Sequence, residues 1–494
     1  MLRSSTLTIR QPSLQESRRR LQGGASVWFA AGAFLLGILA LWSEQSWLLG
    51  YFYGAAYATI AYVFVRTMQV WRDPFNPLCL VLAVAFVRFI LPGLLFLSGA
   101  EAPEDIGEVF YSLQLSARDW QWGNVLALVG LLGVTLGWLS IQVRWSRVLP
   151  VQFLLTDGTK YIAFAGMALG LAALLAFVLS NASLAVVLTG GFRGTTIQEG
   201  TGKFFFLAYF LIAGSVLWSC YLLTEERNWL ALAPVLAAAM FYWVLGGRNR
   251  AMTPIACGLL LLWYFRREQA SWPKFSIGPR YLVSAFLGFI VVAWLSYVGL
   301  LYRGEYGVGA FAEALSLTKF WEHVQASVYG DLGQLHSLAG AIAIGPGVLH
   351  GVTFIGALSW PLGAIFPIPG RSAGVFIVET LAGFANGNRW GVNASLVGDS
   401  YLNFGLLGTI VVTLIFGAIL KILYLRFRRG RLHGALYAVA VLSCVQISWV
   451  SIEAWPQALV TLGATWLLIF LGRTIFRARY ASEEQRQDER RFYA

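Results

Sequence analysis

Long apolar segments alternate with short polar loops along most of the chain. Each of these segments is close to the ~20 apolar residues that a hydrocarbon core of ~30 Å requires. We therefore predict an all-α, polytopic integral membrane protein with about 12 transmembrane helices. The predicted spans cover residues 27–43, 47–65, 77–99, 121–141, 160–180, 204–222 and 229–245, an eighth span ending before Arg266, and residues 281–301, 402–424, 434–452 and 457–473.

The composition agrees with this pattern. Of the 494 residues, 58% are hydrophobic and only 12% are charged, whereas soluble globular domains carry about 25% charged residues. The net charge of +12 does not indicate nucleic acid as a partner, because the basic residues lie in short loops between apolar segments. All four cysteines fall inside apolar segments without metal-ligand spacing, so we expect buried thiols and no disulfide framework.

The placement of basic residues predicts the orientation. Only ten of the 36 lysines and arginines lie outside the loops and tails that we assign to the cytoplasm. By the positive-inside rule, both termini then face the cytoplasm and the longest loop faces outward. The predicted regions are a cytoplasmic tail (1–26), transmembrane helices 1–9 (27–301), a large external loop (302–401), transmembrane helices 10–12 (402–474) and a second cytoplasmic tail (475–494).

The external loop, residues 302–401, differs from the rest of the chain. It is rich in glycine, contains three prolines between Trp360 and Arg371, and holds no full-length apolar span. A segment of this length is too long for a connector, and loops held by a rigid scaffold often carry function. We expect this loop to contain short helices and, with a few buried arginines, to form the active site of a membrane enzyme.

Several arginines on the external side are candidates for binding an anionic ligand. Arginine at a membrane surface is costly unless it is paired or meets an anion, and its guanidinium binds phosphate in a bidentate way. Glycine neighbours, as in the predicted tight turn from Gly246 to Arg250, allow close approach of the backbone. Pairing with carboxylates or lipid headgroups is the alternative for each arginine. The candidates are Arg193, Arg248, Arg250, Arg303, Arg371 and Arg389.

Four residues near the same loop are candidates for a general base. They are Glu305, Asp331, His336 and Asp399. For Asp399 the alternatives are a helix N-cap or an ion pair. Arg88, inside the third predicted span, fits a structural pair across helices as well as it fits substrate binding. Since no HExxH, paired CxxC, P-loop or GxGxxG pattern occurs, a zinc protease or an ATP-driven pump is disfavoured.

One stretch resembles a known family. The sequence Arg389-Trp-Gly-Val-Asn-Ala-Ser-Leu-Val-Gly-Asp399-Ser-Tyr-Leu-Asn-Phe-Gly405 is similar to the Wzy-type O-antigen and exopolysaccharide repeat-unit polymerases. In that family a serine, an acidic residue and Tyr-Leu-Asn-Phe-Gly lead from the external loop into the next span. The family has Glu more often at the position of Asp399. The resemblance covers about residues 240–425, and its other pieces are Gly246-Gly-Arg248, Asp331, His350-Gly-Val-Thr-Phe354 and Pro367-Ile-Pro-Gly-Arg371.

The resemblance implies a glycosyltransferase of the GT-C-like layout in the bacterial inner membrane. A glycan chain on undecaprenyl diphosphate would be transferred, at the periplasmic face, to the nonreducing end of another lipid-linked repeat unit. Besides this donor, this acceptor and membrane lipid, the implied partner is a chain-length regulator, and no cofactor is implied. We expect the donor diphosphate to be held by Arg193, Arg248, Arg250 and Arg303, so that no metal ion is needed, and the second diphosphate by Arg371 and Arg389. We expect the acceptor hydroxyl to be oriented or deprotonated by Asp331, His336 or Asp399.

Three other classes stay open. A ligase that moves finished glycan from the same lipid to another acceptor would share the arginines and the loop. Twelve spans are also common in transporters and lipid-linked glycan flippases, although the sequence shows no pair of related halves. A non-catalytic scaffold of an envelope assembly would not need external arginines beside glycines.

Overall fold

The computed structural model describes most of the chain as helices. The described residues are 25–43, 46–71, 73–98, 115–141, 157–181, 202–224, 230–244, 248–268, 291, 294, 298, 316, 320, 334–359, 372–382, 392–430 and 432–492. No strand occurs among them, so the all-α prediction is confirmed for this part of the chain.

Six helical runs are long and apolar enough to cross a membrane: Trp47–Gln69, Pro77–Leu97, Ala117–Ser140, Gly158–Asn181, Ser395–Arg428 and Ile452–Ile475. Large apolar side chains also face outward, with Trp42 81% and Leu407 73% exposed, as on a surface that lipid covers. Both observations support a multi-pass membrane protein. The total of about twelve spans stays a prediction, because shorter apolar helices accompany the six and most of the predicted span at 281–301 lies outside the described residues.

The first helices are α2 (Ala25–Ser43), α3 (Ser46–Trp71), α4 (Pro77–Ala85), the π-helical η1 (Phe86–Ile90), α5 (Leu91–Leu97), α7 (Ala117–Ser140) and α8 (Asp157–Asn181). The middle of the chain forms α10 (Gly202–Leu207), α11 (Tyr209–Thr224), η2 (Leu230–Leu232), α12 (Ala233–Val244) and α13 (Arg248–Glu268). The last third forms α17 (Leu335–Ile344), α18 (Val352–Leu358), α20 (Ala373–Ala382), α21 (Ser395–Arg428), α22 (Gly434–Val450), η4 (Ile452–Ala454) and α23 (Trp455–Phe492).

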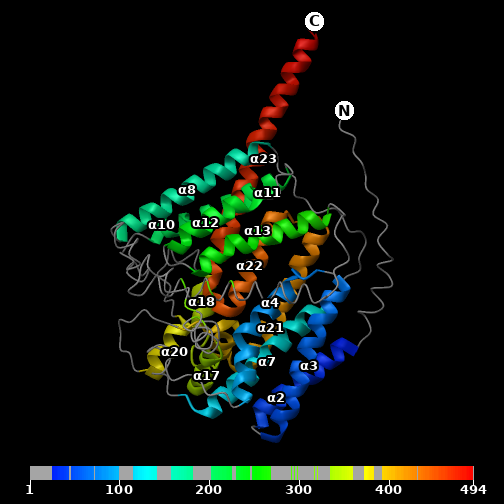
Figure 1. Cartoon of the computed structure of the whole chain (residues 1–494), viewed down its shortest axis with the longest axis vertical. Coiled ribbons are helices and arrows are strands. Elements are labelled where there is room, and N and C mark those ends of the chain that lie inside the picture. Colours follow the sequence, from blue (N-terminus) through cyan, green and yellow to red (C-terminus); the bar gives the residue numbers. More distant parts are fainter. Residues whose placement is uncertain are drawn as a thin grey trace.

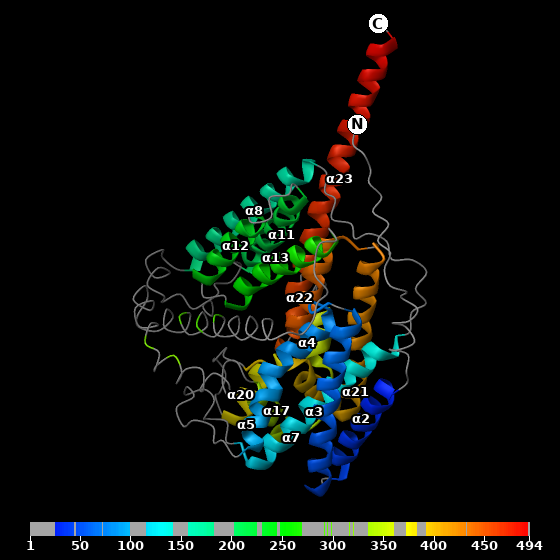
Figure 2. The same ribbon diagram turned by 45° about the vertical axis from the view of Figure 1, so that its right-hand side comes forward.

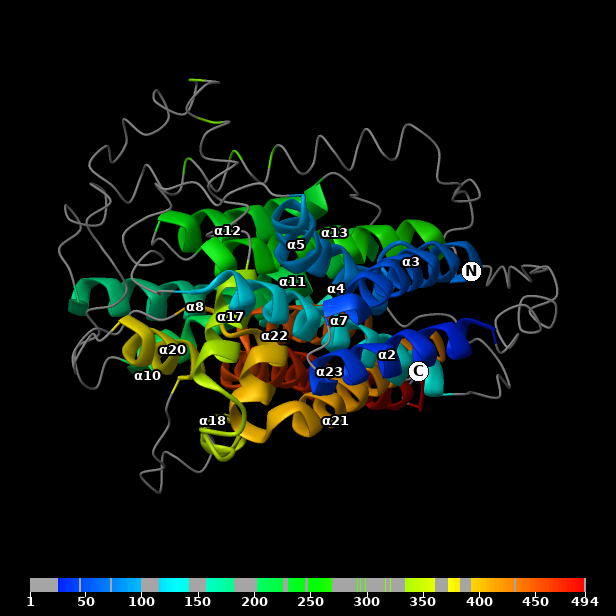
Figure 3. The same ribbon diagram turned by 90° about the horizontal axis from the view of Figure 1, so that it is seen from below.

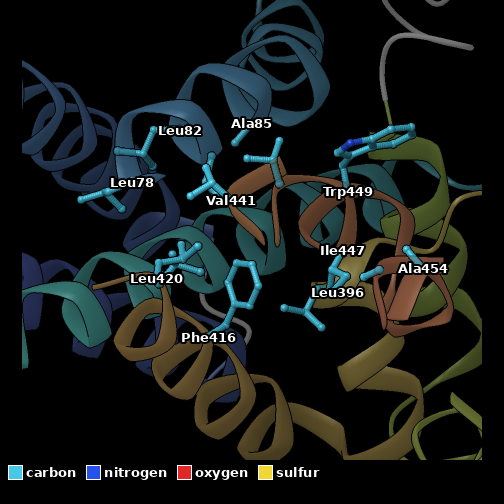
Figure 4. Packing of buried hydrophobic residues seen from close by; sticks show 14 of the residues in the cluster. Leu78, Leu82, Ala85, Leu396, Phe416, Leu420, Val441, Ile447, Trp449 and Ala454 are labelled. Atoms are coloured by element: carbon cyan, nitrogen blue, oxygen red, sulfur yellow. The ribbon is translucent and has the colours of Figure 1, made fainter. Parts of the chain in front are cut away.

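The helices lie in two groups that α22 and α23 join. Figures 1 and 2 show α8, α11, α12 and α13 side by side in the upper half, and α2, α3 and α7 together in the lower half. α22 packs against α4 and α21 as well as α13, and α23 packs against α8 and α11. In Figure 4, leucines of α4 (Leu78, Leu82) and of α21 (Leu396, Leu420) surround apolar side chains of α22, where the three helices meet.

Two helix starts in the lower group have strong capping signals. At the start of α7, Ser116 and Asp119 form a reciprocal capping box, in which the Ser116 amide donates to Asp119 Oδ2 at 2.8 Å. At the start of α4, the Leu78 amide donates to Asn76 Oδ1 at 3.0 Å, and Pro77 occupies the first helical position. Such caps satisfy backbone donors that have no partner inside the helix.

α7 is the central helix of the lower group, and glycine allows α21 to pack closely against it. A Cβ on Gly137 of α7 would overlap the carbonyl oxygen of Leu414, and a Cβ on Gly417 of α21 would overlap the carbonyl oxygen of Val134. Small residues at helix contacts let backbones approach in this way within membranes. The two helices are therefore held together by direct backbone proximity.

The structure agrees with the expectation from sequence for the cysteines but not for the turn at residues 246–250. The four cysteines are free, and Cys444 is partly buried while the other three are buried, as expected. The arginines expected in a tight turn at residues 246–250 are instead already helical, since α13 begins at Arg248. A helix can begin directly at these residues because its first N–H groups need no intrahelical acceptor.

A buried carboxylate joins several helices at the end of α3. Asp73 has no exposed surface, and its Oδ2 accepts hydrogen bonds from the hydroxyls of Tyr264 on α13 and Tyr424 on α21, both at 2.9 Å. The Phe75 amide donates to Oδ1 at 3.2 Å, and the Tyr437 hydroxyl of α22 lies 3.3 Å from that of Tyr264. A buried charge needs such partners, because desolvation without them is costly.

We expect Tyr264→Phe to lower the free energy of unfolding by about 2 kcal/mol, the usual value of a hydrogen bond to a charged group. Thermal unfolding of the protein in detergent measures this loss. Tyr51→Phe is the matched control, because the Tyr51 side chain is 70% exposed. Equal stability of the two variants would contradict a role of the Tyr264 hydroxyl in holding Asp73.

Candidate active site

The stretch that resembles the glycan polymerases is largely helical. α21 begins at Ser395, ahead of the span start predicted at residue 402, and ends at Arg428. Gly405 interrupts it with φ 67° and ψ −162°, a conformation that is open almost only to glycine. The helix after this break is ~34 Å long, which is enough to cross a hydrocarbon core of ~30 Å. Asp399 therefore lies on a separate short helix that precedes this longer part.

Asp399 is the centre of a buried polar cluster. Its Oδ1 accepts hydrogen bonds from Thr353 Oγ1 at 2.6 Å and from Asn403 Nδ2 at 2.8 Å. Asn403 Nδ2 also donates to Thr353 Oγ1 at 2.6 Å. Asp399 and Asn403 face each other because they are four residues apart on one helix, while Thr353 comes from α18. We call Thr353, Asp399 and Asn403 the Asp399 cluster.

The second carboxylate oxygen of Asp399 has a different environment. Oδ2 is buried and makes no hydrogen bond of normal geometry to any residue that the structure describes. The backbone amide of Ile452 acts as a donor toward the carboxylate from outside normal hydrogen-bond geometry, and the carboxylate of Glu453 is close enough to repel its negative charge. A buried acceptor without a donor of good geometry is incompletely satisfied, which costs free energy, so this oxygen can gain a hydrogen bond from a ligand hydroxyl.

Glu453 links this cluster to α20. Its Oε2 accepts a hydrogen bond from Ser372 Oγ at 2.9 Å, and its Oε1 accepts one from the backbone amide of Ala373 at 2.6 Å. A carboxylate at the first turn of a helix is favoured by the unpaired N–H groups there. Glu453 thereby joins the turn before α23 to the start of α20.

The backbone around these side chains is strained. Three non-glycine residues in the described part of the chain have positive φ: His350 at 45°, Ser395 at 58° and Ser451 at 145°. Conformations of this kind cost ~1–3 kcal/mol each and are concentrated at functional sites. Each of the three lies shortly before one of the polar side chains just described, in the order Thr353, Asp399 and Glu453.

The segment from Gly347 to Phe354, which contains the polymerase-like piece at residues 350–354, contacts the first part of α21. The amides of Gly347 and Leu349 donate to the carbonyls of Tyr401 and Leu402, at 3.0 and 2.9 Å. These carbonyls can accept bonds from outside the helix because the break at Gly405 displaces their helical donors. The rings of Phe354 and Phe404 also pack at 5.0 Å. Figure 3 shows α17, α18 and α20 gathered beside α21.

The structure separates the predicted base candidates. Asp399 is in the cluster, whereas His336 is buried in the first turn of α17, with 5% of its surface exposed. α17 packs on α21 through Leu338, which lies next to Gly398. His336 is not among the hydrogen-bond partners of the Asp399 carboxylate within the described part of the chain. Glu305 and Asp331 lie outside the described residues.

Of the six predicted phosphate-binding arginines, only Arg250 has a described side chain. It is half-buried in the first turn of α13 and interacts with the hydroxyl of Tyr209 and with Tyr242. For Arg248 the helical backbone is described and the side chain is not. Arg193, Arg303, Arg371 and Arg389 lie outside the described residues. A diphosphate site made by these arginines stays a prediction.

Glu453 was missed by the reasoning from sequence. It lies between the last two predicted spans, in Ile452-Glu-Ala-Trp-Pro, about fifty residues after Asp399. Charged residues are ordinary in loops between membrane spans, so this position alone gives no signal of function. Nothing in the local pattern places it beside α18 and α20.

No family model, curated protein or solved structure matches the chain. Within the described residues, no group of three or more His, Cys, Asp or Glu side chains is arranged to hold a metal ion.

Proposed function

We propose that the protein is a membrane glycosyltransferase that polymerises lipid-linked oligosaccharides at the external face of the bacterial inner membrane. The observation that carries this proposal is the arrangement of the Asp399 carboxylate. One oxygen is fixed by Thr353 and Asn403, while the other is buried and has no partner of normal geometry among the described residues. Asp399 lies in the stretch from Arg389 to Gly405 that resembles the polymerases. Its carboxylate accepts a hydrogen bond from Thr353, which lies in another resembling stretch, residues 350–354.

The proposed reaction joins the acceptor hydroxyl to the anomeric carbon of the donor. As the hydroxyl oxygen attacks, its proton moves to Asp399 Oδ2, which acts as general base. The bond between the anomeric carbon and the diphosphate oxygen breaks, and its electron pair leaves with polyprenyl diphosphate. Fixing Oδ1 with two hydrogen bonds orients Oδ2, so the base does not have to reorganise during the reaction.

The departing diphosphate needs charge stabilisation more than it needs a proton. Fixed cations can supply this stabilisation, and the external arginines predicted from the sequence are the candidates. The preference for polymerase over ligase rests on the Tyr-Leu-Asn-Phe-Gly context at residues 401–405, since the two reactions share the donor and the chemistry and differ in the acceptor.

We expect the purified protein to make a ladder of glycan lengths from a synthetic polyprenyl-diphosphate repeat unit in the presence of EDTA. Arginines do not depend on a divalent ion, so the rate with EDTA should stay within about twofold of the rate with Mg²⁺. Gel electrophoresis measures the ladder, and thin-layer chromatography measures the polyprenyl diphosphate that each transfer releases.

The other outcomes separate the competing classes. Transfer to a different acceptor without a ladder indicates a ligase. Movement of the lipid-linked unit across a vesicle bilayer without bond formation indicates a flippase and contradicts the enzyme proposal. A ladder that disappears with EDTA and returns with Mg²⁺ contradicts charge stabilisation by arginines alone.

A further inference from the structure

A second buried polar group near the active site lacks partners. Gln334 directly precedes α17 at the N-cap position, where its side chain makes no capping hydrogen bond. Only 2% of Gln334 is exposed, and neither its amide oxygen nor its amide nitrogen has a hydrogen-bond partner among the described residues. Each unsatisfied buried group of this kind requires an explanation.

The backbone of Gln334 is fixed beside Arg88. Pro92 has no N–H, so the carbonyl of Arg88, four residues earlier, lacks the usual helical donor. This carbonyl instead accepts a hydrogen bond from the Gln334 amide at 2.8 Å. The π-helical turn η1 lies at the same place, and such turns are frequent at functional sites.

The guanidinium of Arg88 is also held in place. Its central carbon lies 4.2 Å from the centre of the Trp449 ring, in a cation–π contact. Trp449 is near the end of α22, two residues before the strained Ser451. Figure 4 shows Trp449 and Ala454 on neighbouring stretches of chain, with Ile447 and Leu396 beside them. Arg88 and Gln334 therefore lie in the same region of the molecule as the turn that carries Glu453.

We propose that Gln334 and Arg88 form a subsite for the hydroxyl groups of a sugar residue in the glycan substrate. An amide both donates and accepts hydrogen bonds, and a sugar hydroxyl does the same. An ionised phosphate only accepts, so it would leave the buried amide oxygen of Gln334 unpaired. The subsite rests on the proposed function, because it takes the ligand to be a glycan, and it is separate from the predicted arginine site for diphosphate.

The first test is the stability of Gln334→Leu. Because an unpaired buried amide is unfavourable and leucine has a similar size, the unfolding midpoint of this variant should equal or exceed that of the wild type. Asn76→Leu is the matched control, since Asn76 is also a fully buried amide at an N-cap but its oxygen accepts the Leu78 amide. That control should unfold at a lower temperature. A Gln334→Leu midpoint as low as that of Asn76→Leu would mean that Gln334 is structural, and it would overturn the subsite.

The second test measures how much the sugars contribute to affinity. The probes are polyprenyl diphosphate and the same lipid carrying one repeat unit, and the measured quantity is the ratio of their dissociation constants. The wild type should prefer the glycosylated lipid, and Gln334→Leu should reduce this preference about tenfold, as expected when one or two hydrogen bonds are lost. Its affinity for polyprenyl diphosphate alone should be unchanged.

Either of two results would overturn the subsite: a wild type without preference for the glycosylated lipid, or a Gln334→Leu variant that keeps the full preference. Failure of the polymerase proposal looks different. In that case the wild type forms no ladder, while the sugar-dependent affinity and its loss in Gln334→Leu persist.

Discussion

Replacing Asp399 with asparagine is expected to slow glycan polymerisation by about 100-fold or more, the lower range for loss of a general base. Asparagine keeps the size of the side chain and can still accept hydrogen bonds from Thr353 and Asn403, but it cannot take a proton. The loss should therefore appear in kcat, with the affinity for the lipid-linked donor little changed. Initial rates of polyprenyl diphosphate release over a range of donor concentrations measure both quantities.

Two further variants test whether the loss of rate is specific to the base. Thr353→Val removes one hydrogen bond that orients the carboxylate but leaves the base, so the rate should fall by about tenfold, the equivalent of ~1.4 kcal/mol for a lost hydrogen bond. Asp119→Asn changes an acidic residue of a capping box on α7 and should polymerise at the wild-type rate. If Asp399→Asn, folded and at normal abundance, also polymerised at that rate, Asp399 would not be the base.

Gly137→Leu and Gly417→Leu are each expected to lower the free energy of unfolding by about 3 kcal/mol or more. The side chain at either position would overlap a backbone carbonyl of the opposite helix, and a backbone atom cannot rotate away as a side chain can. Overpacked sites usually cost about 1–3 kcal/mol, and separation of α7 from α21 would also displace the Asp399 cluster. Thermal unfolding in detergent and the yield of monodisperse protein both report this loss.

The matched control for both glycines is Gly463→Leu. Gly463 lies in α23, and a Cβ there would meet no atom within 4 Å in the part of the chain that the structure describes. The helix propensity of leucine is about 0.8 kcal/mol more favourable than that of glycine, so this control should be as stable as the wild type or slightly more stable. Wild-type stability in Gly137→Leu would contradict the close packing of α7 and α21.

Much of the helical framework could be predicted from sequence, because each membrane segment must be apolar over its whole length. The predicted spans at 27–43 and 434–452 differ by at most two residues at each end from α2 and α22. Six long apolar helices support the membrane class. The boundary between the loop and the tenth span was harder to predict. The span was expected to begin at residue 402, whereas α21 begins at Ser395 and is interrupted at Gly405.

The candidate site was predicted only in part. Asp399 was identified as a base candidate from its sequence context, and the contact with Thr353 joins two segments that the resemblance had named separately. Glu453 and Gln334 could not be found in this way. Their importance depends on neighbours far away in the sequence, such as Ser372 and Arg88, and local pattern carries no information about such contacts.

The last helix also has a practical consequence. α23 runs without interruption from Trp455 to Phe492, whereas the candidate membrane span ends at Ile475. Figures 1 and 2 show its end projecting beyond the rest of the molecule. A small helical protein whose first helix continues α23 after Phe492 would be attached rigidly, so its orientation would be fixed relative to the membrane helices. Such a fusion offers a rigid fiducial for particle alignment in electron cryomicroscopy, placed at the opposite end of α23 from Glu453.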